Sequence, residues 1–223
     1  MPADILALFD LDHTLLSIDS DEAWVEHLIA QGAIDRKSFE ARNRRIGERY
    51  RRGEADVIEF TEFYLSTLIP FHADELSRWR DDFVARRVLP SIPAAARALV
   101  ARHRDAGDLC VLTTATSRFL TEPIAAELGF EHLIATEPER SNGRYTGKVL
   151  GLPNMRERKV DRLTAWLAER GHTLNAFRES WFYSDSVNDI PLLSKVTHPV
   201  AVNPDPVLAR HAAAHRWPLL RLE

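Results

Sequence analysis

The chain has 223 residues, of which 45% are hydrophobic and 28% are charged, and its formal net charge is −4. This length suffices for one good-sized domain, or for one domain with a smaller insertion, and the composition is typical of soluble globular proteins. The acidic balance argues against nucleic acid as a partner, because binding through counterion release needs a basic surface.

The single cysteine and the start of the chain bear on the cellular compartment. Cys110 lies in an apolar run without a disulfide partner, which favours a reducing environment and a core role for the thiol. Residues 1–9 lack the basic region and long apolar stretch of a signal peptide. No segment approaches the ~18 apolar residues of a membrane-spanning helix. We therefore expect a cytoplasmic protein with no membrane partner; the sequence indicates no oligomeric state.

The first predicted element is a strand over residues 5–9, a short apolar run that ends in Asp10. Such runs are typical of parallel strands buried on both faces. Residues 17–89 then show no strand pattern but four amphipathic helical patterns, at 23–29, 39–51, 57–68 and 76–88.

The length of this helical stretch decides how we interpret it. A single crossover connection needs only about a dozen residues, so helices packed on the sheet as ordinary crossovers are the less favoured alternative. Pro90 and Pro93 mark the exit. We predict a helical cap at 17–89, inserted into a core formed by residues 1–16 and 90–223.

After the insertion, apolar runs and helical patterns alternate. Strands are predicted at 109–112, 132–135, 181–183 and 199–202, and helices at 94–104, 119–128 and 158–170. Asn142-Gly143 indicates a tight β-hairpin. The alternation predicts an α/β fold with a doubly wound parallel sheet.

Two acids follow the first strand directly, in the motif Asp10-Leu11-Asp12-His13-Thr14. Ligands of open α/β sheets bind beyond the carboxyl ends of the strands. Residues two apart on an extended chain point to the same side, so both carboxylates can address one ligand. One acid can then serve as a nucleophile while the other holds a proton. An isolated pair of this kind is also compatible with a solvated acidic turn.

A second acidic motif, Ser184-Asp185-Ser186-Val187-Asn188-Asp189, follows the strand at 181–183. A few carboxylates, water and a substrate phosphate suffice to bind Mg²⁺. Helix capping would account for one of the two acids but not for both. Together the motifs predict a magnesium site at the edge of the sheet.

Two further residues complete the set that phosphoryl transfer requires. Thr114, or its neighbour Thr113, ends the strand that begins at Leu109, and Lys159 lies near the start of a helix. A hydroxyl and a fixed positive charge next to paired acids provide the positioning and electrostatics of phosphoryl transfer.

These motifs, in this order along the chain, resemble those of the haloacid dehalogenase-like (HAD) superfamily, in the phosphoserine-phosphatase-like branch with a helical cap. The resemblance implies a Rossmann-like core and a magnesium-dependent phosphatase acting on a small-molecule phosphate ester through an aspartyl-phosphate. Asp12 matches the second acid that dehalogenases lack. The run Thr114-Ala115-Thr116-Ser117-Arg118-Phe119 resembles the branch's motif and favours Thr114 over Thr113.

The resemblance also implies a role for each site residue. Asp10 is the nucleophile and Asp12 the general acid/base, and Mg²⁺ is held by the Asp10 side chain, the Asp12 carbonyl and Asp185. Asp189 supports the metal site. Phosphate contacts are implied for Thr114, Lys159 and Asn188.

Asp19 occupies the place where phosphoserine phosphatases carry a carboxylate for the substrate amine. Asp19 and Asp21 are equally suited to cap the first cap helix, so both interpretations stay open. If the amine interpretation holds, Trp24 could face a cation, and the substrate is an amino-alcohol phosphate. Histidinol phosphate ranks ahead of phosphoserine, because phosphoserine also needs a cap arginine for its carboxylate.

The cap does contain a run of arginines, and most of its members are expected on a solvated helix face. Glu40 with Arg44 and Glu48 with Arg52 have the spacing of favourable i,i+4 pairs. One arginine of the run could still turn inward toward an anion. The members of the run are Arg42, Arg44, Arg45, Arg49, Arg51 and Arg52.

Three other functions are alternatives to a phosphatase. A phosphomutase shares the nucleophile and the capped fold but returns the phosphate to a sugar. A non-catalytic phospho-acceptor module would have neither the second acid, Asp12, nor the long insertion. A silent binding module is disfavoured because every residue needed for turnover is present.

Overall fold

The computed structural model describes residues 4–222, and its centre is a six-stranded parallel sheet. The strand order is β3-β2-β1-β6-β7-β8, and every neighbouring pair is parallel. The predicted doubly wound α/β sheet is confirmed. The strands are β1 (Ile5–Phe9), β2 (Leu109–Ser117), β3 (His132–Thr136), β6 (Glu179–Ser184), β7 (His198–Val202) and β8 (Leu219–Leu220).

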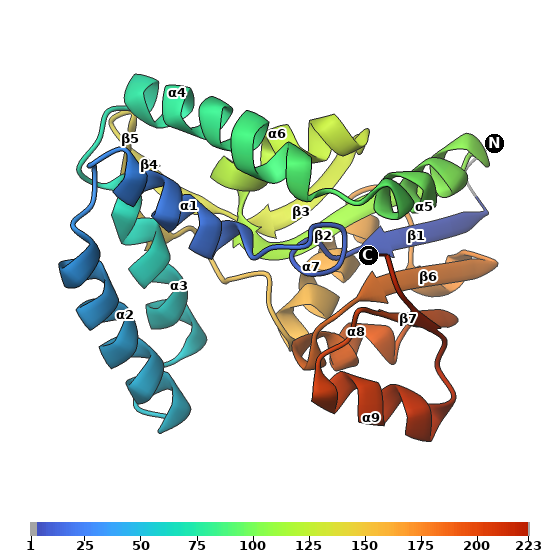
Figure 1. The fold of residues 1–223 in the computed structure, drawn as a ribbon. Coiled ribbons are helices and arrows are strands. Elements are labelled where there is room, and N and C mark those ends of the chain that lie inside the picture. The colour runs from blue at the N-terminus through green and yellow to red at the C-terminus, as the bar shows by residue number, and fades with distance from the viewer. Residues whose placement is uncertain (1–3, 223) are drawn as a thin grey trace.

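Helices cover both faces of this sheet (Figure 1). The alternating residues of β1 explain why: Leu6 and Leu8 enter one apolar cluster, and Ala7 and Phe9 enter the other. The first cluster includes residues of α7 (Glu157–Ala168), α8 (Ile190–Leu193) and α9 (Pro206–His215), and the second includes residues of α5 (Ala94–Asp105) and α6 (Arg118–Leu128). A strand that is buried on both sides must be apolar at every position.

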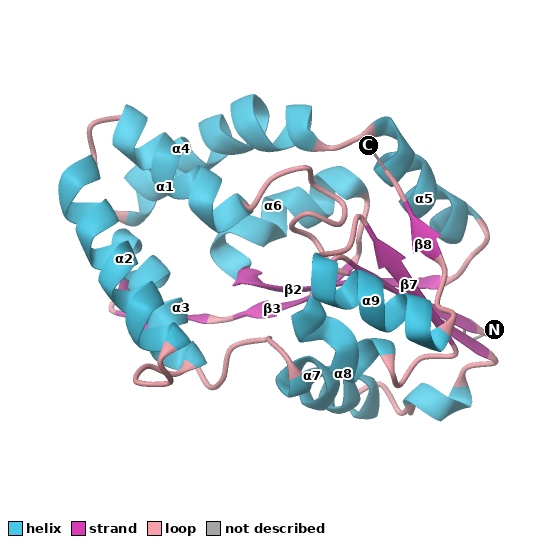
Figure 2. Cartoon of the chain, turned by 60° about the horizontal axis from the view of Figure 1, so that its bottom comes forward, coloured by secondary structure: helices cyan, strands magenta, loops and turns pink. Residues whose placement is uncertain are grey.

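The insertion after β1 is helical, as expected, and most of it stands beyond the carboxyl ends of the strands (Figures 1 and 2). It contains α1 (Ser20–Ala30), α2 (Arg36–Arg51), α3 (Val57–Leu65) and α4 (Ala73–Phe83). Helices α1 to α3 share a small core of their own, which includes Val25, Phe39, Ile46 and Phe63. The assignment of residues 17–89 as a separate unit stays a prediction.

The predicted hairpin at Asn142-Gly143 is confirmed as β4 (Pro138–Ser141) and β5 (Arg144–Val149). It packs against the cap helices instead of joining the main sheet. The Val149 amide donates to Glu62 of α3 at 3.3 Å. Gly147 has a φ of +80°, a conformation that favours glycine, and a Cβ there would lie 2.5 Å from Ile69 Cδ1. A segment from outside 17–89 therefore contacts the inserted helices.

Two predicted element ends were wrong. Strand β2 does not stop at Leu112 but continues through the threonines to Ser117, because β-branched residues suit a buried strand. The helix predicted over 76–88 is regular only to Phe83 and continues as a π-helical turn over Val84–Val88. In residues 4–222, no helix is both long and apolar enough to cross a lipid bilayer.

Candidate active site

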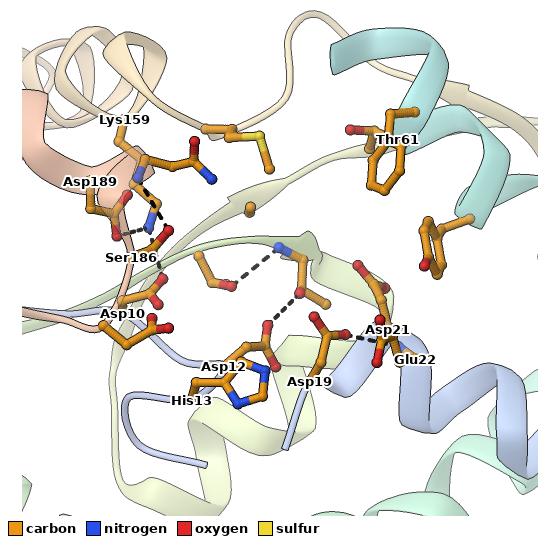
Figure 3. Close-up of a pocket in the computed structure, with 18 residues that line it drawn as sticks. Asp10, Asp12, His13, Asp19, Asp21, Glu22, Thr61, Lys159, Ser186 and Asp189 are labelled. Atoms are coloured by element: carbon orange, nitrogen blue, oxygen red, sulfur yellow. Dashed lines mark hydrogen bonds and ion pairs between the residues drawn. The ribbon is translucent and has the colours of Figure 1, made fainter. Parts of the chain in front are cut away.

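A cavity of about 250 Å³ opens where β1, β2 and β6 end, between the sheet and cap helix α3. Every site residue predicted from the sequence lines it. The core contributes Asp10, Asp12, Thr114, Lys159, Asp185, Asn188 and Asp189, and the cap contributes Asp19, Asp21, Glu22, Phe60, Thr61 and Tyr64. Figure 3 shows Asp10 and Lys159 at one end, Asp19, Asp21 and Glu22 at another, and Thr61 across the cavity from Asp10.

Lys159 ties the two acidic motifs together. Its Nζ donates to Asp10 Oδ1 and to Asp189 Oδ2, both at 2.7 Å. The three side chains are almost completely buried. Burial by itself would lower the pKa of Lys159, but the two carboxylates outweigh it and raise the pKa, so the side chain stays an ammonium.

Asp189 is committed to this contact. Its Oδ2 also accepts from Ser184 Oγ at 2.7 Å, and the residue is 2% exposed. Asp189 therefore holds Lys159 in place, which fits the supporting role expected of it.

Thr14 lies between the carboxyl groups of Asp10 and Asp185. Its Oγ1 is 3.3 Å from Asp10 Oδ2 and 3.2 Å from Asp185 Oδ1, and it accepts from the Asp185 amide at 3.0 Å. Burial, and then the charge of Asp10, raises the pKa of Asp185 to about 8. Burial also raises the pKa of Asp10, although Lys159 opposes it. The ionised forms of these two acids are thus disfavoured as long as no cation joins them.

This donor set fits magnesium. Among residues 4–222, no three His, Cys, Asp or Glu side chains form a ready-made metal cage. Magnesium does not need one, because one or two carboxylates, water and the substrate phosphate complete its octahedron. Asp10 and Asp185 offer hard oxygen ligands on either side of one hydroxyl, and a cation there would offset their mutual repulsion.

The carboxylate of Asp12 is held separately from that of Asp10. It accepts from the Ser20 amide and from Thr116 Oγ1, each at 2.7 Å. Burial, and then the charge of Asp19, raises the pKa of Asp12 to about 7, so both of its protonation states are accessible near neutral pH. Sequence analysis missed Thr116, although the spacing Thr114-Ala115-Thr116 places both hydroxyls on one side of a strand.

Thr113 and Thr114 lie on opposite sides of β2. Thr113 Oγ1 accepts from Asn154 Nδ2 at 3.0 Å and is fully buried, whereas Thr114 lines the cavity. Asn154 was also missed. Its side-chain Nδ2 also donates to the backbone carbonyls of Thr114 and Ile134. These bonds connect the loop before α7 to β2 and β3.

The acids near α1 have more than one role. Asp19 caps the helix, because its Oδ1 accepts from the Glu22 amide at 2.8 Å, yet it also lines the cavity.

The expectation for Trp24 was wrong: it is 2% exposed and packs on Phe83 and Phe119, away from the cavity. Burial of this large apolar ring among α1, α4 and α6 favours the observed position.

None of the six arginines of the run at 42–52 lines the cavity. Arg42, Arg45 and Arg49 lie in a separate cleft between α2 and α3, where Arg49 pairs with Glu59. The expected i,i+4 ion pairs are also absent among the described residues: Glu40 pairs with Arg36, and Arg52 pairs with Glu54. Exposed ion pairs are weak, so several partners compete on equal terms.

Comparison with known proteins identifies this arrangement. The family model described as haloacid dehalogenase-like hydrolase matches residues 7–194, which include both acidic motifs and Lys159. The chain belongs to the haloacid dehalogenase-like hydrolase family. The expected family and enzyme class, a phosphomonoester hydrolase, are thereby confirmed.

Relatives of this HAD-like hydrolase span its full length. A protein of Neisseria meningitidis serogroup C named histidinol-phosphatase is 41% identical over 98% of this chain and 99% of its own. A crystal structure of a Bordetella pertussis Tohama I protein of unknown function is 47% identical, with a TM-score of 0.94 and complete coverage of both chains. A substrate-bound phosphoserine phosphatase shares the fold at 16% identity, with a TM-score of 0.67 over 99% of this chain and 93% of its own.

The contact between Thr116 and Asp12 yields a first prediction. Thr116→Val keeps the side chain's shape but removes the hydroxyl that orients the Asp12 carboxylate. A hydrogen bond to a charged group contributes about 1.5–3 kcal/mol, so kcat should fall roughly 10- to 100-fold. Steady-state phosphatase assays measure this loss.

Thr121→Val is the matched control, because Thr121 is a buried threonine of α6 whose hydroxyl donates only to Ser117 O. If Thr116→Val retains wild-type kcat, or if both variants lose activity alike, Thr116 does not orient Asp12.

Proposed function

We propose that this HAD-like phosphatase hydrolyses histidinol phosphate with the help of Mg²⁺. The observation that carries the proposal is the composition of the cavity beside Asp10. The carboxylates of Asp19, Asp21 and Glu22 and the rings of Phe60 and Tyr64 line it, and no arginine among residues 4–222 does.

This lining suits a cation and a ring but not an additional anion. Histidinol phosphate carries an ammonium and an imidazole next to its phosphate ester. Phosphoserine carries a carboxylate, which would meet three acids without a positive partner near them. Like charges brought together cost several kcal/mol.

The relatives support the same assignment. The meningococcal relative named histidinol-phosphatase aligns over nearly the whole chain at 41% identity. The substrate-bound phosphoserine phosphatase is only 16% identical, so its likeness bears on the fold and not on the substrate.

The proposed reaction has two steps. Asp10 attacks phosphorus to give an aspartyl-phosphate, and the bond from phosphorus to the alcohol oxygen breaks while Asp12 donates its proton to that oxygen. Asp12, now a carboxylate, takes a proton from water, which attacks phosphorus, releases inorganic phosphate and regenerates Asp10. Lys159 offsets the charge of the nucleophile, and Thr114 and Asn188 bind the phosphate oxygens.

In this proposal the side chains of Asp10 and Asp185 and the Asp12 carbonyl hold Mg²⁺, which supplies charge neutralisation at the phosphate. Chelation should abolish phosphate release, and added Mg²⁺ should restore it. Ca²⁺ should restore it poorly, because its longer and looser coordination misplaces the nucleophile. Full activity in excess chelator would contradict the proposal.

The nucleophile is tested by Asp10→Asn. A neutral amide cannot attack phosphorus, so turnover should disappear while the thermal unfolding transition persists. Asp12→Asn is the comparison variant: it should lose about 10²–10⁴-fold in kcat, because only the proton transfer is lost. Wild-type turnover by purified Asp10→Asn would refute covalent catalysis at this residue.

The substrate is tested by kcat/KM for histidinol phosphate, phosphoserine and glucose 6-phosphate. We expect histidinol phosphate to lead by at least tenfold, with release of free phosphate; an isomerised sugar phosphate would indicate a mutase instead. Asp19→Asn and Asp21→Asn should each reduce the ratio of kcat/KM for histidinol phosphate to that for the other two esters. Asn still caps α1, so the first variant removes charge without removing the cap. A higher kcat/KM for either other ester would overturn the assignment.

A further inference from the structure

Helix α3 brings one face to the cavity. Phe60, Thr61 and Tyr64 all line it, and Tyr64 follows Phe60 and Thr61 at the i+4 and i+3 spacings that place helical residues on one face. Phe63, the residue before Tyr64, is buried and packs on Phe39 in the core of the cap. Phe60 and Tyr64 pack against this core with part of their surface and also line the cavity, whose other walls are mostly polar.

The two rings form a continuous wall. The centroids of Phe60 and Tyr64 are 5.6 Å apart, with an angle of 55° between the ring planes. Both residues are only partly buried, so their rings are open to a ligand. In Figure 3, Thr61 marks the position of this helix face, across the cavity from Asp10 and Lys159.

This wall is also connected to the catalytic core. The Phe60 ring lies 5.3 Å from the ring of Tyr50, and the Arg156 guanidinium lies over Tyr50 at 5.6 Å. Arg156 Nε in turn donates to Asn188 Oδ1 at 3.2 Å. A chain of contacts therefore leads from a residue at the phosphate end of the cavity to the aromatic wall.

Tyr64 stands among negative charges. Burial, and then the charges of Asp21, Asp19 and Glu22, raises the pKa of Tyr64, so its phenol keeps its proton and can donate a hydrogen bond. The neighbouring carboxylates can accept one. A ring with one donor and one acceptor nitrogen, or with two donors, finds partners for both here.

We propose that Phe60 and Tyr64 are the specificity-determining residues for the leaving group and bind the imidazole ring of the substrate against the cap. The inference rests on the proposed function. Aromatic faces attract a planar ring by stacking and a protonated ring by cation–π interaction, and a substrate that lacks the ring forgoes the stacking. The acids near α1 then bind the amine, and the wall distinguishes a histidinol ester from smaller amino-alcohol esters.

The test compares histidinol phosphate with phosphoethanolamine, which keeps the phosphate and the amine but lacks the imidazolylmethyl group. Phe60→Leu and Tyr64→Leu should each lower kcat/KM for histidinol phosphate roughly tenfold and change that for phosphoethanolamine less than twofold. Phe60→Tyr should keep the wild-type preference, because it keeps the ring. Phe71→Leu is the matched control, since Phe71 is a partly buried cap residue that packs on Trp79 and does not line the cavity.

The outcomes separate the two proposals. If the wild type does not prefer histidinol phosphate to phosphoethanolamine, both the proposed function and this inference fail. If the wild type prefers it and the two leucine variants keep that preference, only the inference fails. An equal loss on both substrates, with Phe60→Tyr equally impaired, would show that the helix has a structural role and would overturn the inference as well.

Discussion

The buried ammonium of Lys159 between Asp10 and Asp189 is the interaction on which the rest of the site depends. The three groups come from the start of α7, the end of β1 and the η5 turn (Val187–Asp189), so the contact joins segments that lie far apart in the sequence. Removal of one member of a buried charge pair costs about 3–5 kcal/mol, because the other is left unpaired. The contact therefore constrains the fold and the chemistry together.

Two parts of the chain line the cavity, the core and the inserted helices. The core provides Asp10 and Asp12 after β1, the proposed nucleophile and acid/base, and Lys159 at the start of α7, the proposed positive charge. The register of the sheet fixes the position of the strand end that carries the two acids. The cap provides the carboxylates of α1 and the aromatic face of α3. A rigid sheet suits reacting groups that need fixed geometry, whereas inserted helices can vary with the substrate.

The two acids around Thr14 suit the cation that the proposed function pairs with a substrate phosphate. Asp10 and Asp185 repel each other across one hydroxyl, and Lys159 offsets only part of this charge because it also serves Asp189. The Asp12 carboxylate instead accepts hydrogen bonds from the Ser20 amide and the Thr116 hydroxyl, and it can exchange a proton. Neighbouring carboxylates thus acquire different roles from their surroundings.

The sequence by itself determined the sheet of this protein and the candidate site residues that line its cavity. Apolar runs that end in Asp10, Thr113-Thr114 and Asp185 mark parallel strands, and such strands end at a common edge, so these residues had to meet. Only the tertiary structure decided which side chains complete the site. Trp24 is buried in the core, whereas Phe60 and Tyr64 line the cavity. Thr116 hydrogen-bonds to Asp12, and Asn154 hydrogen-bonds to Thr113. The hairpin packs on the inserted helices. Each of these outcomes depends on contacts between segments distant in sequence, which local periodicity does not encode.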